Sequence, residues 1–146
     1  MPTADKKLFT YKYVNGHPGN TKYVKQTVIA TGQLSEIKYG YPFLISEMTI
    51  LTALRTTAVT ILATDYLARK DSKTMVLIGI GAQSEFQTLA HKLIRSIQTV
   101  RYFDTDQQTI KKYANNMKDV DFEFIACDSA KEACEGADNY RCMHCM

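Results

Sequence analysis

The sequence predicts an α/β protein made of two parts, and three observations support this fold class. The first 45 residues carry short β-type segments separated by glycine and proline. Residues 46–69 have the apolar spacing of one long amphipathic helix. From residue 74 onward, apolar strand-like runs alternate with helical segments, and this β-α-β-α-β order is typical of a parallel sheet with right-handed crossovers.

The N-terminal part is predicted to form an antiparallel meander. One candidate strand covers residues 23–31 and ends at Gly32, and a second covers residues 34–39 and ends at Gly-Tyr-Pro. Ahead of them, residues 15–20 (Asn-Gly-His-Pro-Gly-Asn) gather turn-forming side chains, so this segment is predicted to be a loop.

The long helix is predicted to begin with Ser46 as its N-cap and Glu47 in its first turn. Arg69 and Lys70 follow at its C-terminal end, where the helix dipole favours cations. At 100° per residue, most large apolar side chains share one side, which is therefore predicted to be buried. This apolar face consists of Met48, Ile50, Leu51, Leu54, Ala58, Leu62 and Tyr66. The polar break at 71–73 is the predicted domain boundary.

The C-terminal part is predicted to be a parallel sheet, because its strands are short, continuous apolar runs of the kind buried on both faces. The predicted elements are a strand at 74–78, a helix at 83–97, a strand at 99–103, a helix at 107–117 and a strand at 122–126. His91, in the first of these helices, is predicted to lie on an exposed face.

A glycine-rich loop, residues 79–84 (GIGAQS), joins the first of these strands to the helix that follows. Gly79 permits a tight turn, Gly81 lets a pyrophosphate approach the backbone, and the helix N-terminus offers free N–H groups. Asp104 directly follows the second strand, about 20 residues beyond the loop. A carboxylate there accepts hydrogen bonds from a ribose 2′-hydroxyl and repels a 2′-phosphate. Together these features predict a partial Rossmann domain that binds NAD rather than NADP.

Arg55 falls in the middle of the predicted apolar face of the long helix. A buried guanidinium needs a partner, and Asp65 lies about 15 Å further along the helix, too far for a direct pair. The partner is either a carboxylate on another segment or an anionic ligand, since guanidinium holds a carboxylate through two hydrogen bonds. The residues alone leave both possibilities open.

Composition limits the classes of function. The chain has 146 residues, with 18 Lys and Arg against 15 Asp and Glu, so there is no large positive field and a nucleic-acid partner is not expected. No run of about 18 uncharged apolar residues is present and the N-terminus does not resemble a signal peptide, so no membrane association is expected. Cys127 and Cys134 are scattered, which favours reduced thiols and a cytoplasmic location.

Several sequence blocks, in the same order, resemble the ornithine cyclodeaminase/μ-crystallin family. They are KYVNGHP at 12–18, GYP at 40–42, EMT at 47–49, LTALRT at 51–56 and GIGAQ at 79–83. The resemblance runs from about residue 8 to residue 138. Several blocks in register make it far more specific than the glycine-rich loop alone.

The resemblance implies an α/β substrate-binding and dimerisation domain beside a Rossmann NAD domain, working as a homodimer. It also implies conversion of L-ornithine to L-proline and ammonia, with NAD as a recycled hydride carrier. The amine is oxidised to an imine, the side-chain amino group closes the ring with loss of ammonia, and the cyclic imine takes the hydride back. The expected small-molecule partner is L-ornithine or a similar amino acid. The alternatives are a ketimine reductase or amino-acid dehydrogenase of the same superfamily, and a non-catalytic NAD-binding protein.

The resemblance also implies site residues, of which Lys12 and Arg55 would hold the substrate carboxylate. The expected cofactor-binding residues are Thr27, Arg55, Thr56, Gly79, Gly81, Ala82, Gln83 and Asp104. No metal is expected, and the catalytic aspartate is expected beyond Met146. Residues 1–70 would then be part of the substrate-binding and dimerisation domain, and residues 71–138 the first half of the Rossmann domain. The family pattern extends past both ends, so the chain is predicted to be truncated and inactive by itself.

The last residues depart from this pattern, because Asp138 should lead into a fourth aliphatic strand but is followed by NYRCMHCM at 139–146. In one codon choice, removal of a single base near Asp138 restores an aliphatic strand, so a single-base insertion is one hypothesis for this tail. A competing hypothesis is a zinc site. Its ligands would be Cys142, His144 and Cys145, with Cys127 or Cys134 as the fourth.

Overall fold

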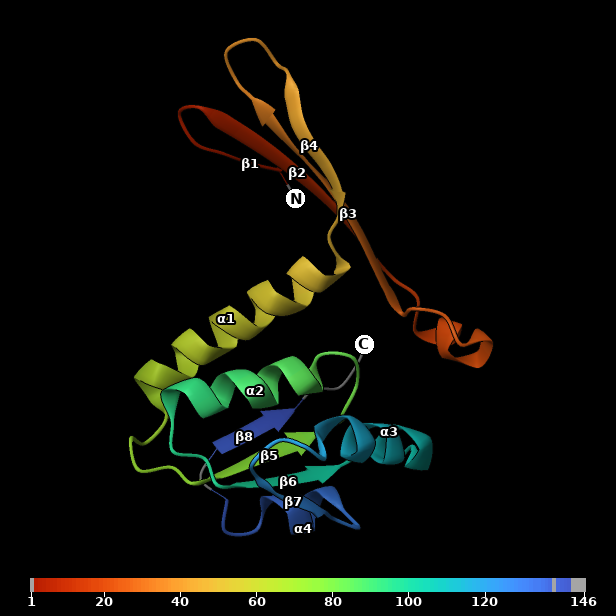
Figure 1. Cartoon of the computed structure of the whole chain (residues 1–146), viewed down its shortest axis with the longest axis vertical. Helices are drawn as coiled ribbons and strands as arrows, with labels where there is room; N and C mark the ends of the chain where they lie inside the picture. The colour runs from red at the N-terminus through yellow and green to blue at the C-terminus, as the bar shows by residue number, and fades with distance from the viewer. Residues whose placement is uncertain (1, 138, 143–146) are drawn as a thin grey trace. The chain divides into compact units, whose positions relative to one another are not determined.

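The computed structural model describes residues 2–137 and 139–142, and the fold class predicted from the sequence is confirmed. The chain divides into two compact units, Met1–Leu54 and Arg55–Met146. The first holds an antiparallel sheet, and the second holds a parallel sheet with helices (Figure 1). The division falls inside the long helix, and the predicted functional boundary at 71–73 stays a prediction.

The first unit is a four-stranded antiparallel sheet in the order β1-β2-β3-β4. Its strands are β1 (Pro2–Ala4), β2 (Leu8–Gly16), β3 (Val28–Glu36) and β4 (Pro42–Glu47). The two long strands, β2 and β3, pair along their whole length, from Leu8 opposite Glu36 to Gly16 opposite Val28. The predicted meander is therefore confirmed, with strand bounds that differ from those expected.

Gly32 does not end a strand, as the sequence suggested, but lies inside β3 and is buried. A Cβ at this position would overlap Met48 Sδ and lie 2.6 Å from Met48 Cε and 3.2 Å from the Tyr11 carbonyl oxygen. The glycine is thus required by the close approach of the Met48 side chain. The two strands predicted at 23–31 and 34–39 are one strand because this glycine serves packing and not a turn.

Two other boundaries in this unit were predicted wrongly. Asn15 and Gly16 still belong to β2, and the turn-forming segment continues as a 3₁₀ helix, η1 (Pro18–Tyr23). Ser46 is paired in β4 and is not a helix N-cap. The helix α1 (Thr49–Leu67) starts later, and the Glu47 carboxylate accepts a hydrogen bond of 2.5 Å from the Thr49 N–H.

α1 buries its threonine side and exposes the apolar face that was predicted to be buried. Its buried residues are Thr52, Ala53, Thr57 and Thr64. Its exposed large apolar residues are Ile50, Leu51, Leu54, Val59, Leu62, Tyr66 and Leu67. Helical periodicity identifies an apolar stripe correctly, but it does not say which side the rest of the chain covers.

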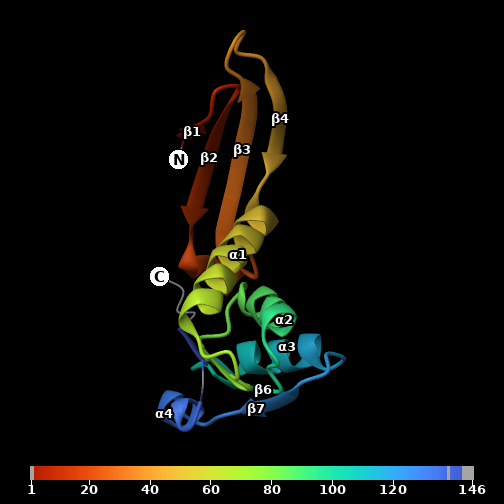
Figure 2. The ribbon, with the colours of Figure 1, turned by 90° about the vertical axis from the view of Figure 1, so that its left-hand side faces the viewer.

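The second unit contains a parallel sheet in the order β7-β6-β5-β8, and the predicted β-α-β-α-β order is confirmed. Its strands are β5 (Thr74–Ile78), β6 (Thr99–Phe103), β7 (Glu123–Ala126) and β8 (Asn139–Cys142). Its helices after α1 are α2 (Ser84–Ile94), α3 (Gln107–Met117) and α4 (Ala130–Cys134). Seen from the side, α2 and α3 cover one face of this sheet and α4 lies on the other (Figure 2).

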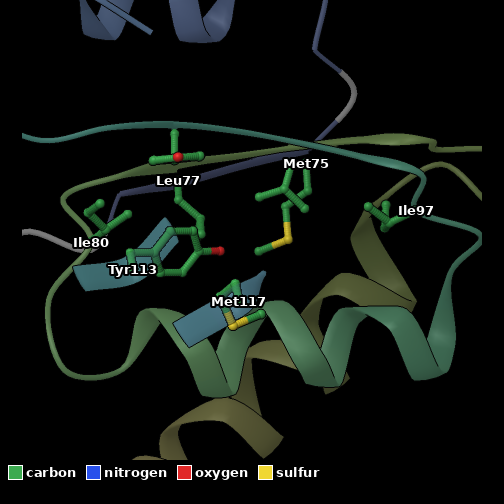
Figure 3. Packing of buried hydrophobic residues seen from close by; sticks show 8 residues of the cluster. Met75, Leu77, Ile80, Ile97, Tyr113 and Met117 are labelled. Atoms are coloured by element: carbon green, nitrogen blue, oxygen red, sulfur yellow. The ribbon is translucent and has the colours of Figure 1, made fainter. Parts of the chain in front are cut away.

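The core of this unit forms between β5 and the helices on either side. Met75 and Leu77 are fully buried and pack with Ile80, Ile97, Tyr113 and Met117 on one face of the sheet (Figure 3). Val76, from the same strand, packs with Cys127 and Ala133 on the other face. β5 is therefore buried on both faces, as its unbroken apolar run predicts.

The tail hypotheses fall largely outside the described residues. The backbone of β8 pairs in parallel with β5, from Asn139 opposite Met75 to Cys142 opposite Ile78. Asp138 and residues 143–146, which carry the proposed frame shift and two of the proposed zinc ligands, lie outside the described residues. In the parts that the structure covers, no group of three His, Cys, Asp or Glu side chains is placed to hold a metal ion.

α1 and α2 meet through polar side chains, which we call the α1–α2 polar seam: Thr60, Thr64 and Asp65 of α1, and Gln87 and His91 of α2 with its C-cap Arg95. Gln87 Nε2 donates to Thr60 Oγ1 at 3.4 Å, and His91 Nε2 lies 3.2 Å from Thr64 Oγ1. His91 is fully buried, so its predicted exposure was wrong. Its Nδ1 donates to the Gln87 carbonyl at 2.7 Å, which explains how a buried imidazole is satisfied.

Arg95 completes the seam by fastening the C-terminal ends of both helices. Its Nη1 pairs with Asp65 Oδ1 at 2.9 Å and donates to the Ile94 carbonyl at 2.8 Å. Its Nη2 donates to the carbonyls of Thr64 and Asp65 at 3.2 and 3.1 Å. The guanidinium therefore satisfies C-terminal carbonyls of α1 and α2 together, where the dipoles of both helices favour a cation.

No helix within the described residues combines the length and the hydropathy needed to cross a bilayer.

Replacement of Gly32 by alanine is expected to lower the free energy of unfolding by about 1–2 kcal/mol, because the added methyl displaces Met48. Gly16→Ala is the matched control, since a Cβ there meets no atom within 4 Å, and it should change stability by less than about 0.5 kcal/mol. Urea denaturation measures both. Equal effects of the two substitutions would contradict the close approach described for Gly32.

Asp65→Asn is expected to destabilise the protein near pH 6, by an amount that shrinks as the pH falls below about 4. The hydrogen bond from Arg95, followed by the charge of Lys70, lowers the pKa of the Asp65 carboxyl. Because the folded-state pKa is the lower one, this contribution is complete above the unfolded pKa and is lost as the pH falls through the folded pKa. Urea midpoints at pH 6 and pH 3 test this.

The matched control is Asp71→Asn, which removes only an exposed 3.8 Å pair with Arg69 and should leave stability nearly unchanged. A difference between wild type and Asp65→Asn that grows toward acid pH would contradict the assignment.

Candidate functional site

The loop between β5 and α2 is held in a tight turn by its own backbone. Gly79 has a φ of +78°, the left-handed region that glycine adopts without strain. Its N–H donates to the Phe103 carbonyl at 2.9 Å, which ties the loop to the end of β6. At the other end, the Ser84 N–H and hydroxyl both bond the Gly81 carbonyl, at 3.0 and 2.8 Å. These hydrogen bonds hold the loop at both of its ends.

The start of α2 has the features of an anion site. The N-cap residue, Gln83, makes no side-chain capping hydrogen bond, so no side chain of its own satisfies the first-turn N–H groups. Ala82 is exposed, and Gly81 and Gln83 are partly exposed, so the loop backbone is accessible. The partial positive charge of the helix N-terminus lies at the same place. These properties suit a phosphate group.

Asp104 lies beside this loop because β5 and β6 are neighbours in the sheet, with Ile78 opposite Phe103. Its Oδ2 accepts a hydrogen bond of 2.8 Å from the Ile80 N–H, and its Oδ1 accepts one of 2.9 Å from the Asp106 N–H. The carboxylate is half-exposed and keeps lone pairs for further donors. The structure thus brings the predicted ribose acid to the loop, where it also braces the loop backbone.

Arg55 is exposed on α1, so the sequence argument that a buried guanidinium must find a partner fails. The apolar face on which it was placed is the side of α1 that this chain leaves uncovered. Thr56 is half-buried, and Thr57 is buried on the threonine side. The substrate role of Arg55 therefore depends on the family resemblance and stays a prediction.

Lys12 and Thr27 both lie in the first unit. Lys12 is half-buried on β2 directly opposite Gly32, so its side chain starts on the face of the sheet that Met48 covers. Thr27 immediately precedes β3, and its carbonyl accepts a hydrogen bond of 2.6 Å from the His17 N–H. The other predicted site residues belong to the second unit, and the convergence of all of them on one substrate stays a prediction.

Sequence reasoning missed three residues that support the site. Asp106 caps α3, its Oδ1 accepting the Gln108 N–H at 2.9 Å, and this bond lowers the pKa of its carboxyl. An Asp before a helical segment is an N-cap signal that could have found it. Gln87 and Arg95 belong to the α1–α2 polar seam, and no sequence pattern marks them, because polar residues on a helix usually face solvent.

A family model described as "Ornithine cyclodeaminase/mu-crystallin family" matches residues 1–139 of the chain. Among curated relatives, ornithine cyclodeaminase of Agrobacterium fabrum is 54% identical over 138 residues, and that of Brucella suis is 51% identical over the same length. These alignments cover 94% of this chain and 39% and 38% of the relatives. The chain thus spans about two fifths of the length of these relatives.

Solved structures agree with the fold. A lysine cyclodeaminase, whose structure concerns recognition of L-lysine, L-ornithine and L-2,4-diaminobutyric acid, aligns with a TM-score of 0.90 at 30% identity, over 97% of this chain and 42% of that one. The Δ1-pyrroline-2-carboxylate reductase of Thermococcus litoralis, in complex with NADH and L-proline, aligns with a TM-score of 0.87 at 36% identity, over 92% of this chain and 42% of that one. An archaeal alanine dehydrogenase dimer with bound NAD aligns with a TM-score of 0.82 at 33% identity, over 91% of this chain and 41% of that one.

Proposed function

The chain belongs to the ornithine cyclodeaminase/mu-crystallin family, and we propose that it binds NAD at the loop between β5 and α2. The observation that carries this proposal is the hydrogen bond from the Ile80 N–H to Asp104 Oδ2. It holds a half-exposed carboxylate beside a glycine turn and an uncapped helix N-terminus, which are the three parts of a dinucleotide site. The residues present therefore fit this cofactor.

Each part of the site has a distinct task in this proposal. The N–H groups of Ala82 and Gln83 would bind the pyrophosphate, with Gly79 and Gly81 keeping side chains out of its path. Asp104 would accept hydrogen bonds from the adenosine ribose, and its charge would exclude a 2′-phosphate. When bound, NAD would supply the acceptor that takes a hydride from the substrate and later returns it.

We propose conversion of L-ornithine to L-proline and ammonia as the activity of the whole protein, where this chain spans about two fifths of the length of the ornithine cyclodeaminases it matches. Support comes from the 54% identity to an ornithine cyclodeaminase, against 36% to an archaeal alanine dehydrogenase and 31% to pyrroline-carboxylate reductases. In this reaction Arg55 and Lys12 would hold the substrate carboxylate, and Thr27, Arg55 and Thr56 would contact the nicotinamide end. Their task is to hold the reacting carbon against the cofactor.

The reductase and dehydrogenase relatives define the alternative reaction, reduction of a cyclic or open-chain imine without loss of ammonia. Conversion of L-ornithine to L-proline and ammonia without net formation of NADH separates the cyclodeaminase from the reductase and the dehydrogenase. Binding of NADH without turnover of any amino or imino acid would favour a non-catalytic role. We propose that this chain is inactive by itself, since the family's catalytic aspartate is expected beyond Met146.

A homodimer is part of the same proposal. The exposed apolar face of α1, including Leu51, Leu54 and Leu62, is a surface that water disfavours and a partner would cover. The free, buried thiol of Cys127 is compatible with the proposed cytoplasmic location.

Asp104→Asn is expected to weaken NADH binding about tenfold, because a neutral amide replaces charge-assisted hydrogen bonds to the ribose. The preference for NADH over NADPH should narrow in the same variant, since the repelling charge is gone. Titration of each dinucleotide, followed by its fluorescence, measures both effects. Asp106→Asn is the matched control, because asparagine caps a helix as well as aspartate does. Equal affinities in the two variants would overturn the assignment of Asp104.

Arg55→Lys is expected to weaken binding of L-proline to the NADH-loaded chain about tenfold or more, because lysine cannot hold a carboxylate with two parallel bonds. NADH affinity is expected to fall by a smaller factor, because in this proposal Arg55 also contacts the nicotinamide end. Arg69→Lys is the control, since Arg69 lies beyond the end of α1 and its 3.8 Å pair with Asp71 is exposed. Calorimetric titration of each NADH-loaded variant with L-proline measures the two affinities. An unchanged proline affinity in Arg55→Lys would remove Arg55 from the substrate site.

A further inference from the structure

We propose that Arg95 is a positioning residue for the nucleotide site, an inference that rests on the proposed function. By fastening the C-terminal ends of α1 and α2, it fixes the axial position of α1 on α2. Residues at the other end of this contact are thereby kept level with the nucleotide loop. Arg95 itself lies far along α2 from that loop and touches no part of it.

The register of the polar seam carries the first step. Thr60 bonds Gln87, and one turn further along both helices Thr64 contacts His91. The two helices therefore run in the same direction. The two helices lie side by side in both views of the ribbon (Figures 1 and 2). One turn earlier on each helix, the same register places Thr56 level with Gln83. The family resemblance, which does not depend on this register, implies that both residues bind the cofactor.

The chemistry of the seam carries the second step. An apolar contact between helices is non-directional and tolerates sliding or rotation, whereas paired donors and acceptors specify one register. The threonine side of α1 faces α2 although α1 carries an ample apolar face that could have been buried instead. The sequence thus places directional contacts where the axial position of α1 matters, and leaves its apolar side for another surface.

The third step is that stability alone does not account for Arg95. Its side chain is only 5% exposed, while its partner Asp65 is 50% exposed, so a costly burial is offset by a solvent-screened pair. Within the described residues, its Nε is buried without a hydrogen-bond partner. What the guanidinium does supply is geometry, because its rigid fork joins carbonyls of Thr64, Asp65 and Ile94 at once.

The test compares Arg95→Lys with Arg101→Lys in the whole chain. Lysine keeps the charge at position 95 but cannot hold the carbonyls of both helices in a fixed fork. Arg101 is the matched control, because its guanidinium likewise bonds a helix-cap carbonyl, that of Glu135, but on the opposite side of the sheet from α1. Two measurements are made on each variant: NADH affinity, and hydrogen exchange of α1 amides against α3 amides.

Arg95→Lys is expected to speed exchange in α1 but not in α3, and to weaken NADH binding about tenfold as the aligned population falls. Arg101→Lys should leave both quantities near wild type. Faster α1 exchange with unchanged NADH affinity would overturn the positioning role and leave Arg95 as a structural clamp. Wild-type chain that binds no NADH would instead reject the proposed function itself, so the two failures are distinguishable.

Thr64→Val is the milder second variant, for use where Arg95→Lys does not fold. It keeps the side-chain shape and removes the hydroxyl that contacts His91 Nε2 and also bonds the Thr60 carbonyl one turn earlier. A smaller loss of NADH affinity in the same direction is expected. Its matched control is Thr88→Val, which likewise removes a buried hydroxyl that bonds the carbonyl one turn earlier, that of Ser84, but that faces Tyr113 in α3 and not α1. Equal NADH affinity in Thr64→Val and wild type would count against the seam.

Discussion

The parallel pairing of β5 with β6 is the constraint on which the candidate site depends. It places the ends of both strands at one edge of the sheet, so the turn after Ile78 and the carboxylate after Phe103 meet without any help from the loop sequence. The Gly79 N–H extends this pairing into the turn, and Asp104 extends it again through Ile80. The site is therefore anchored to a strand that is buried on both faces.

α1 shows how one helix can serve two surfaces with different physical demands. On its threonine side, directional contacts to α2 set a register, and the guanidinium of Arg95 closes the seam at the helix ends. On its leucine side, non-directional apolar area is available for a larger contact. Because the two sides of α1 have these different roles, its apolar stripe makes the helix easy to predict. The side that it buries is nevertheless the one that periodicity would assign to solvent.

The parallel sheet and its loop were predictable because each element has a strong local signal. β5 and β6 are continuous apolar runs of strand length, and the glycines and Asp104 follow them at the spacing that a dinucleotide requires. The first unit was predicted less well because Gly32 was interpreted as a strand end, when the reason for this glycine is Met48, sixteen residues away. The burial of His91 and the exposure of Arg55 were missed for a related reason. Local pattern states which side chains share a face, but only tertiary structure states which face another element covers.

The strand order has a consequence for how this chain is made. β5 lies at the centre of its sheet, with β6 on one side and β8 on the other, and its residue Met75 pairs with Asn139. During synthesis, β6 emerges soon after β5, whereas the residues of β8 leave the ribosome far later. Until then a largely apolar strand has one open edge, the kind of surface on which nascent chains associate with one another. β5, the central strand that anchors the loop, is thus the strand whose open edge a chaperone would cover during synthesis.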